Sequence, residues 1–253
     1  MKINVRYAGL DGCKAGWWAW GTDGVGNWLG QLYTTLEDFW QAHGGTLITA
    51  LIDIPIGLLD NLSDPRVCDG WARDQLGGQR SSVFIPPVRA TLALLDPDDR
   101  STEAYRRACA VNQNACGKKI SKQAFFISFK IKEADDFLHK HPAAQKVLAE
   151  AHPELAFQWL KGSALVYKKK EAMGREERTS LLQPHIPNLP GLWADVRGQY
   201  LKKEVQDDDM LDAWVLALLA IERLAPLQDH PSPAPIDGEG LPMRLRLPGF
   251  GKC

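Results

Sequence analysis

Four aspartates of this chain stand where a metal-dependent enzyme acting on phosphodiesters would need its ligands. Asp11 and Asp53 each end an apolar stretch, and a charge there is costly unless it is paired or bound to a metal. Asp209 and Asp212 stand three residues apart at the start of a long apolar segment, so a helix would place both on one face. If these carboxylates converge from two strands and a helix, they form an all-oxygen site, the kind that selects Mg²⁺ or Mn²⁺.

Further acids, Glu150 and Glu154, lie where an expected strand near residues 146–151 ends and a helix begins. Pro153 fits the first turn of a helix, so Glu154 would lie where the strand passes into that helix. Either Glu150 or Glu154 could complete a ligand set or act as a general base, and His152 could carry protons and contact a substrate. The alternative is a helix cap with solvated acids.

The segment 79–89 combines arginines and serines around a rigid proline pair. Arginine and serine together bind phosphate well, so we expect this segment to hold a substrate phosphate. The residues concerned are Arg80, Ser81, Ser82 and Arg89. The alternative is a surface loop with ordinary salt bridges.

Residues 11–16 predict a tight loop of small residues at a strand exit, with Lys14 as a further substrate contact. Such a loop allows a phosphate or a metal-bound group to approach the backbone. The alternative is an aspartate in a hairpin turn. The segment matches neither a G-x-G-x-x-G fingerprint nor a Walker loop.

Residues 118–132 carry five lysines, including Lys122, together with three phenylalanines and no acids. Basic and aromatic residues side by side suit a nucleic-acid groove. The alternative is a solvated basic face over core aromatics. The lysine run 168–170 is a weaker signal of the same type.

The hydrophobic pattern predicts an α/β protein. Residues 60–143 are expected to form helices and loops that interrupt the strand pattern, as an insertion between the fourth and fifth strands. Residues 226–253 hold six prolines and four glycines and are expected to form a tail. Strands are expected at residues 3–10, 17–22, 27–33, 46–54 and 146–151, and helices at residues 35–43, 172–183 and 207–224.

The bulk composition limits the possible partners. The 253 residues carry a net charge of −1, so any nucleic-acid contact must come from local patches.

The five cysteines are an odd number without zinc-ligand spacing, which indicates reduced thiols. Neither a signal peptide nor an apolar run long enough for a bilayer is evident, so we expect a cytoplasmic protein without membrane contact.

Several segments, in order, resemble domain of unknown function family 429, described as predicted nucleases of the ribonuclease H-like superfamily. The resemblance implies a ribonuclease H-like mixed five-stranded sheet flanked by helices, here over residues 1–225. Resolvases of that superfamily use an acid on the first strand, one on the fourth, and an aspartate pair on the last helix. The long insertion has no resolvase counterpart. The matching segments are residues 10–17, 52–57, 68–69, 72–73, 80–84, 152–154 and 209–213.

We therefore expect a two-metal nuclease or phosphodiesterase, with Mg²⁺ or Mn²⁺ held by Asp11, Asp53, Asp209 and Asp212 and with Glu154 completing the site. Its substrate would be nucleic acid or a small phosphodiester, and a homodimer is compatible with the sequence. One alternative is a nucleotide-binding phosphotransferase of the sugar-kinase and actin type. Another is a non-catalytic binding protein on the same fold.

Overall fold

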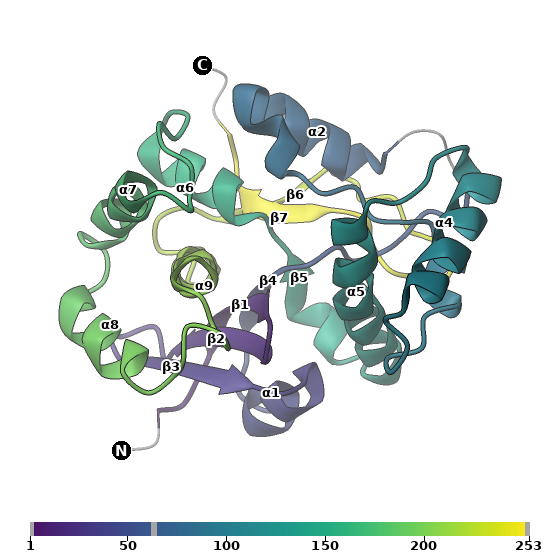
Figure 1. The fold of residues 1–253 in the computed structure, drawn as a ribbon. Coiled ribbons are helices and arrows are strands. Elements are labelled where there is room, and N and C mark those ends of the chain that lie inside the picture. Colours follow the sequence, from purple (N-terminus) through teal and green to yellow (C-terminus); the bar gives the residue numbers. More distant parts are fainter. Residues whose placement is uncertain (1–2, 62–64, 251–253) are drawn as a thin grey trace. The chain divides into compact units, whose positions relative to one another are not determined.

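The computed structural model describes residues 3–61 and 65–250 (Figure 1). The chain divides into two compact units, each of which is built from separate stretches of sequence. The first unit comprises Met1–Asp53, Ala143–Gln228 and Arg246–Cys253, and the second comprises Ile54–Pro142 and Asp229–Leu245. Part of the proline- and glycine-rich C-terminal segment thus belongs to the same unit as the insertion.

The first unit is built on a mixed five-stranded sheet in the order β3-β2-β1-β4-β5. The first three strands form antiparallel pairs, whereas β4 pairs with β1 and β5 pairs with β4 in parallel. The predicted α/β fold with a mixed five-stranded sheet flanked by helices is confirmed, including the helical segment between the fourth and fifth strands. The strands are β1 (Tyr7–Cys13), β2 (Gly16–Thr22), β3 (Trp28–Tyr33), β4 (Thr49–Asp53) and β5 (Leu148–Glu150).

The first strand extends further than the sequence indicates. Asp11 lies within β1, opposite Trp18, and the pairing with β2 continues to Cys13 opposite Gly16. Only residues 14–15 remain for the hairpin turn. The expectation of a phosphate-accepting loop at residues 11–16 is therefore wrong, because cross-strand hydrogen bonds occupy most of that segment.

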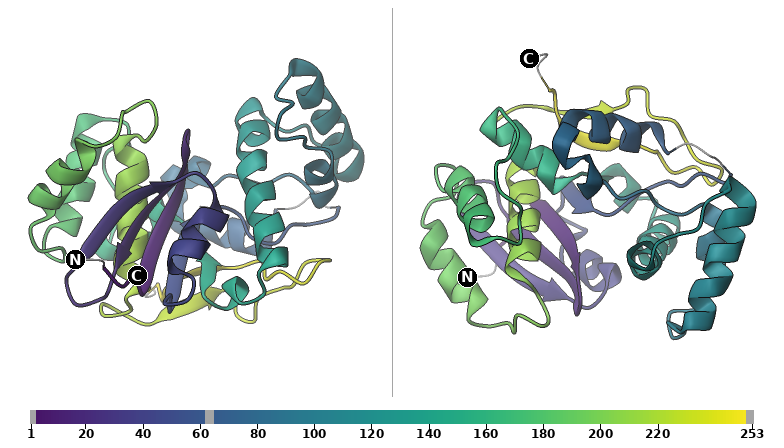
Figure 2. Two further views of the ribbon diagram at one scale, coloured as in Figure 1. Left: turned by 90° about the horizontal axis from the view of Figure 1, so that it is seen from below. Right: turned by 45° about the horizontal axis from the view of Figure 1, so that its top comes forward.

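Helix α9 is the central helix of the first unit and packs against β1, β2 and β4 (Figures 1 and 2). Its residues from Met210 to Ala220 are all buried, which explains why its sequence is apolar on every side. Trp214 stacks on Trp20 of β2 with ring centroids 3.9 Å apart. The helices of this unit are α1 (Leu36–His43), α6 (Pro153–Lys161), α7 (Ala172–Leu182), α8 (Leu189–Arg197) and α9 (Asp207–Ala220), with the short 3₁₀ helix η2 (Ala144–Lys146).

Gly9 of β1 allows α9 to lie directly on the sheet. A Cβ atom at this position would stand 2.1 Å from the carbonyl oxygen of Ala213 and 2.3 Å from the backbone nitrogen of Ala217. Both neighbours are backbone atoms, so they cannot move aside as a flexible side chain would. The absence of a side chain at Gly9 therefore sets the distance between helix and sheet.

We expect Gly9→Ala to lower the free energy of unfolding by about 3 kcal/mol, because the added methyl group forces α9 away from β1. Urea unfolding followed by circular dichroism measures this loss. Gly45→Ala is the matched control, since a Cβ atom there would meet no atom within 4 Å. Equal unfolding midpoints for the two variants would contradict the close approach.

The second unit is mainly helical. Ser101 and Ser121 cap its two longest helices, and their hydroxyls accept the N–H groups of Ala104 and Ala124. Its elements are α2 (Val67–Leu76), η1 (Gly77–Ser82), α3 (Arg89–Ala93), α4 (Thr102–Cys116) and α5 (Lys122–Lys140). Two further short strands, β6 (Leu227–His230) and β7 (Leu245–Pro248), pair with each other.

Two expectations concern the whole chain. Among the described residues, Cys13, Cys68, Cys109 and Cys116 form no disulfide, and Cys253 lies outside the described residues. Among the described helices, none has the length and apolar character that crossing a membrane requires.

Candidate metal centre

Three predicted aspartates meet at one place in the first unit. The parallel register of β1 and β4 sets Asp11 directly beside Asp53. Gly9 lies two residues before Asp11 on the same face of β1, and its contact with Ala213 brings the preceding residue, Asp212, to the two strand acids. Each of the three carboxylates offers an oxygen, and these atoms all lie within 4.8 Å of one another.

Burial in this cluster favours the neutral forms of Asp11 and Asp53. Burial, and then the charges of Asp53 and Asp212, raise the pKa of Asp11 well above its ordinary value. Burial also raises the pKa of Asp53 to about 7, with Asp212 and Glu154 adding to the shift. Three crowded carboxylates in a place with little solvent need a cation before all of them can ionise.

We expect Asp53→Asn to stabilise the metal-free protein more at high pH than at low pH. With a pKa of about 7 in the folded state and about 3.9 unfolded, Asp53 holds its proton longer in the folded protein. The wild type therefore loses stability as pH rises through that interval. The advantage of the variant should grow by on the order of 2 kcal/mol between about pH 5 and pH 8.

Urea unfolding in a chelator at several pH values measures this difference. Asp195→Asn, at an exposed position of α8, is the control and should show no such trend. A pH-independent difference between Asp53→Asn and the wild type would show that Asp53 titrates at its ordinary pKa.

A lysine that the sequence analysis did not select supplies a counter-charge to the cluster. Lys169 Nζ donates to Asp212 Oδ2 at 2.7 Å. The charge of Asp212, followed by those of Asp11 and Asp53, raises the pKa of Lys169 well above its ordinary value. The Lys169 side chain is 37% exposed whereas that of Asp212 is 1% exposed, so the ammonium stands between the buried acid and solvent.

The loop that carries Lys169, residues 162–171, is fixed to helix α7. Glu177 accepts the backbone N–H groups of Val166 and Tyr167, each at 3.1 Å. Gly174 lies so close to the loop that a Cβ atom there would stand 2.0 Å from the carbonyl oxygen of Lys168. The backbone on the N-terminal side of Lys169 is therefore held in place.

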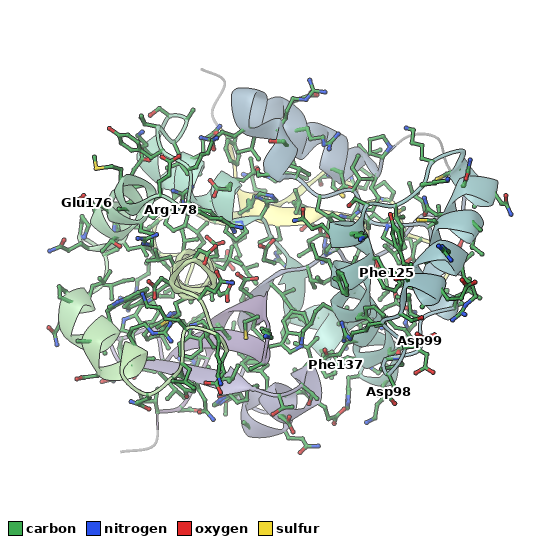
Figure 3. The ribbon with its side chains drawn as sticks, viewed as in Figure 1. Asp98, Asp99, Phe125, Phe137, Glu176 and Arg178 are labelled. Carbon is green, nitrogen blue, oxygen red and sulfur yellow. The ribbon has the colours of Figure 1, made fainter. Side chains whose placement is uncertain are left out.

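Arg178 of α7 joins this loop to Glu154. Its Nη2 donates to both carboxylate oxygens of Glu154 at 2.7 Å, and its Nη1 donates to the carbonyl oxygens of Gly174 at 2.9 Å and Tyr167 at 3.3 Å. In Figure 3, Arg178 points from α7 towards the interior of the unit, whereas Glu176 lies at its outer edge. Glu154, predicted as a catalytic residue, holds this arginine, so its visible role is to position the loop that carries Lys169.

Asp209 lies near the three acids but has a local partner. Its Oδ2 accepts the N–H of Gln206 at 2.8 Å, and the two residues form a reciprocal capping box at the start of α9. Burial raises the pKa of Asp209 to about 6, with Asp208 and Asp212 adding to the shift. Asp209 is thus electrostatically coupled to the cluster while it also begins the helix, and its role as a metal ligand stays a prediction.

The other residues predicted to contact a substrate are not part of the cluster of Asp11, Asp53 and Asp212. Lys14 is exposed in the β1–β2 turn, and His152 is the N-terminal cap residue of α6. Lys122 begins α5 in the second unit. Exposed residues of η1, also in the second unit, complete the set: Arg80, Ser81 and Ser82. Their proposed contacts with a substrate stay predictions.

Arg89 is surrounded by carboxylates of its own unit. It donates to Asp135 at 2.9 Å, pairs with Asp237, and lies 3.5 Å from a carboxylate oxygen of Glu239. Asp135 and Glu239 also form, with His139, a second group whose potential ligand atoms lie within 4.8 Å of one another. The positive charge of the Arg89 guanidinium is already paired with these carboxylates. Arg89 therefore stabilises the second unit, and its predicted contact with a substrate phosphate stays a prediction.

The relationship to known proteins agrees with the motifs in the sequence. The family described as "Protein of unknown function (DUF429)" matches residues 9–235. The chain belongs to the DUF429 family. The match confirms the family that the motifs indicated and includes all three clustered aspartates. Neither the curated proteins nor the solved structures contain a match to this DUF429 chain.

Two charged residues beside the aspartate cluster, Arg178 and Lys169, have only weak signals in the sequence. Arg178 shares a helix face with Gly174 and Leu182, all at intervals of four residues and all buried. A buried arginine on an otherwise apolar helix face is costly unless an acid is buried beside it, and Glu154 is that acid here. Lys169 stands in a lysine run, and nothing in that run distinguishes the one lysine that reaches Asp212.

Proposed function

We propose that the chain is a metal-dependent hydrolase of phosphodiesters whose divalent cation is held by Asp11, Asp53 and Asp212. The observation that carries the proposal is the convergence of these carboxylates, with ligand atoms within 4.8 Å of one another. The mixed sheet is consistent with a ribonuclease H-like fold. Nuclease activity on DNA or RNA is the finer form of the proposal, and a small phosphodiester is the alternative substrate.

The donor set fits Mg²⁺ or Mn²⁺. All three ligands are carboxylates, the hard oxygen donors that these ions prefer. Asp212 Oδ1 is buried and accepts no hydrogen bond from the described residues, although its Oδ2 accepts one from Lys169. A buried acceptor of this kind is costly unless a cation or donor reaches it. A divalent ion bound here would lower the pKa of a water molecule and stabilise charge on a phosphate group.

The residues outside the cluster can bind the substrate phosphate. Lys169 orients Asp212 through its hydrogen bond and presents its exposed side to solvent. Beside it is a cavity of about 260 Å³ whose lining includes Lys170, Arg175 and Lys202. Lys202 also pairs with Asp207, another residue of the lining, so the cations of this wall are partly neutralised. Lysine and arginine next to a carboxylate site would hold a phosphodiester and leave its scissile bond near the acids.

The alternatives have less support. The nucleotide-binding phosphotransferase was favoured by an open loop at residues 11–16, and that segment is strand and hairpin turn. A non-catalytic binding protein would keep the aspartates without needing a cation between them. A titration with Mn²⁺ distinguishes the two, because a metal-dependent hydrolase must bind the ion whereas a non-catalytic binding protein need not.

Calorimetric titration with Mn²⁺ tests the site directly. The wild type should bind Mn²⁺, and Asp53→Asn should weaken binding by more than about tenfold because it removes one charged ligand. Lys169→Gln should bind the ion at least as tightly as the wild type, because the lysine repels the cation. The stoichiometry reports whether one or two ions bind.

Asp195→Asn serves as the control and should bind Mn²⁺ like the wild type. Absence of Mn²⁺ binding by the wild type would overturn the proposal and favour a binding protein whose acids are balanced by Lys169 alone. Binding that is unchanged in Asp53→Asn would place the ion at another site.

A further inference from the structure

Lys169 contacts the aspartate cluster and the solvent with one side chain. Its Nζ donates to Asp212 Oδ2 at 2.7 Å, yet 37% of the side chain is exposed. The Asp212 side chain is only 1% exposed, so the lysine reaches a buried carboxylate from the solvent side. The ammonium therefore lies where it could also reach an anion that approaches from solvent.

The loop that carries Lys169 is held in place, whereas the lysine side chain is able to turn. Glu177 accepts the backbone N–H groups of Val166 and Tyr167, and a Cβ atom at Gly174 would collide with the backbone of the same loop. A lysine side chain has a flexible four-carbon stem and three N–H donors. The ammonium can therefore move from one acceptor to another without a movement of the loop.

A cation bound by the cluster would weaken the contact between Asp212 and Lys169. Asp212 Oδ1 is buried and accepts no hydrogen bond from the described residues, so an ion could bind this oxygen while Oδ2 accepts from the lysine. A divalent ion held by the three aspartates would neutralise the negative charge that attracts the ammonium, and it would also repel the ammonium directly. The two cations therefore compete for the charge of one carboxylate.

An anion can reach the same ammonium from a cavity of about 260 Å³ that Lys169 lines. The lining also includes the cations Lys170 and Arg175 and the acids Asp207 and Asp208 at the start of α9. A wall of mixed charge suits an anion with a single negative charge better than a dianion. A phosphodiester is such a monoanion, and its oxygens accept strong hydrogen bonds from lysine.

We propose that Lys169 exchanges its partner when the divalent ion binds. In the metal-free protein Lys169 pairs with Asp212, and in the metal-bound protein it binds the phosphodiester. The inference rests on the proposed function, because it uses the ion and the substrate class given there. Ion and substrate should then bind cooperatively, since the ion releases the ammonium that the substrate needs, and the substrate favours the ion to the same degree.

Calorimetric titration with diphenylphosphinate, with and without Mn²⁺, tests the exchange. This monoanion has two P–C bonds in place of the ester bonds of a phosphodiester, so it binds without being hydrolysed. Saturating Mn²⁺ should tighten its binding to the wild type by at least about tenfold, and the effect in Lys169→Gln should be at least about threefold smaller. Lys168→Gln, which removes an exposed neighbouring charge, is the matched control and should keep the effect of the wild type.

A second titration, in a chelator, releases the lysine by mutation instead of by the ion. Asp212→Asn replaces the charged acceptor of Lys169 with a neutral one, so diphenylphosphinate should bind at least about fivefold more tightly than to the wild type. Asp53→Asn changes an acid of the same cluster but keeps the hydrogen bond of Lys169, and should tighten binding by about twofold at most. The gain should disappear when Lys169→Gln is added to Asp212→Asn.

Two results would overturn the inference and leave the metal centre in place. One is an equal effect of Mn²⁺ on diphenylphosphinate binding in the wild type and in Lys169→Gln, or no binding of diphenylphosphinate to the Mn²⁺-loaded wild type. The other is a metal-free gain that is equal in Asp53→Asn and Asp212→Asn, or that survives the loss of Lys169. A wild type that binds no Mn²⁺ would instead overturn the proposed function and this inference together.

Discussion

Asp11→Asn and Asp212→Asn should each reduce Mn²⁺-dependent cleavage by more than about 100-fold, since even residues that only orient metal ligands contribute 10- to 100-fold. The two carboxylates come from β1 and α9 and have ligand atoms within 4.8 Å of each other and of Asp53. Ligands of one ion act as a unit, so the double variant should be little worse than either single variant. Rates on a panel of DNA, RNA, branched and small phosphodiester substrates measure the effect.

The control for this experiment is Asp195→Asn, which removes an exposed carboxylate of the same unit and should keep full activity. Both aspartate variants are close in shape to the wild type and remove charge from a crowded cluster, so they should remain folded. Cleavage that survives Asp11→Asn would come from another site or from a contaminant. A wild-type protein that cleaves no substrate of the panel with Mg²⁺ or Mn²⁺ would contradict the proposed hydrolase.

The sequence predicts the sheet and the acid cluster because both follow from short-range patterns. An apolar run that ends in an aspartate marks a buried strand, and parallel strands bring such ends together, as they do for Asp11 and Asp53. The spacing from Asp209 to Asp212 marks a helix face. The identity of the central helix follows from its continuous apolar sequence from Ala213 to Ala220, which is typical of a buried helix.

The parts of the site that the sequence does not predict depend on contacts between distant segments. Lys169 reaches Asp212 across 43 positions, and Arg178 reaches Glu154 across 24. Charged residues of this kind look the same in sequence whether they face solvent or a buried acid. The extent of β1 beyond Asp11 was also missed, because small polar and glycine residues signal a turn although pairing with β2 keeps them extended.

Arg178→Met should lower the free energy of unfolding by about 3–5 kcal/mol, the second large effect that we expect. The variant leaves the Glu154 carboxylate buried without its partner, and it removes the donors to Tyr167 and Gly174. The side chains of Arg178 and Glu154 are only 2% and 9% exposed, so water cannot replace the lost contacts. Urea unfolding of the metal-free protein measures the loss.

The double variant Glu154→Leu with Arg178→Met completes a double-mutant cycle. The cycle separates the interaction energy of the ion pair from the destabilisation that each substitution causes by itself. Replacing one partner of a buried ion pair leaves the other charge buried without a counter-charge. Replacing both partners with apolar groups leaves no buried charge. The double variant should therefore be more stable than the sum of the single effects predicts, by at least about 1 kcal/mol. An exposed pair, Glu103 with Arg106, is the control, and its double-mutant cycle should show coupling below about 1 kcal/mol.

A further variant, Glu154→Gln, tests whether the ion pair of Glu154 with Arg178 serves the aspartate site or only the fold. Glu154→Gln keeps the shape of the side chain while it weakens the hold on Arg178 and so loosens the loop that carries Lys169. If Glu154 acts by positioning that loop, Glu154→Gln should bind Mn²⁺ nearly as well as the wild type but bind a phosphodiester more weakly. If Glu154 instead completes the ligand set of the ion, one of the two roles that the sequence leaves open for it, Mn²⁺ affinity should fall about as far as in Asp53→Asn. Positioning by Glu154 would change the phosphodiester titration and leave the Mn²⁺ titration almost unchanged, whereas ligation by Glu154 would change the Mn²⁺ titration. The two titrations therefore decide between these roles.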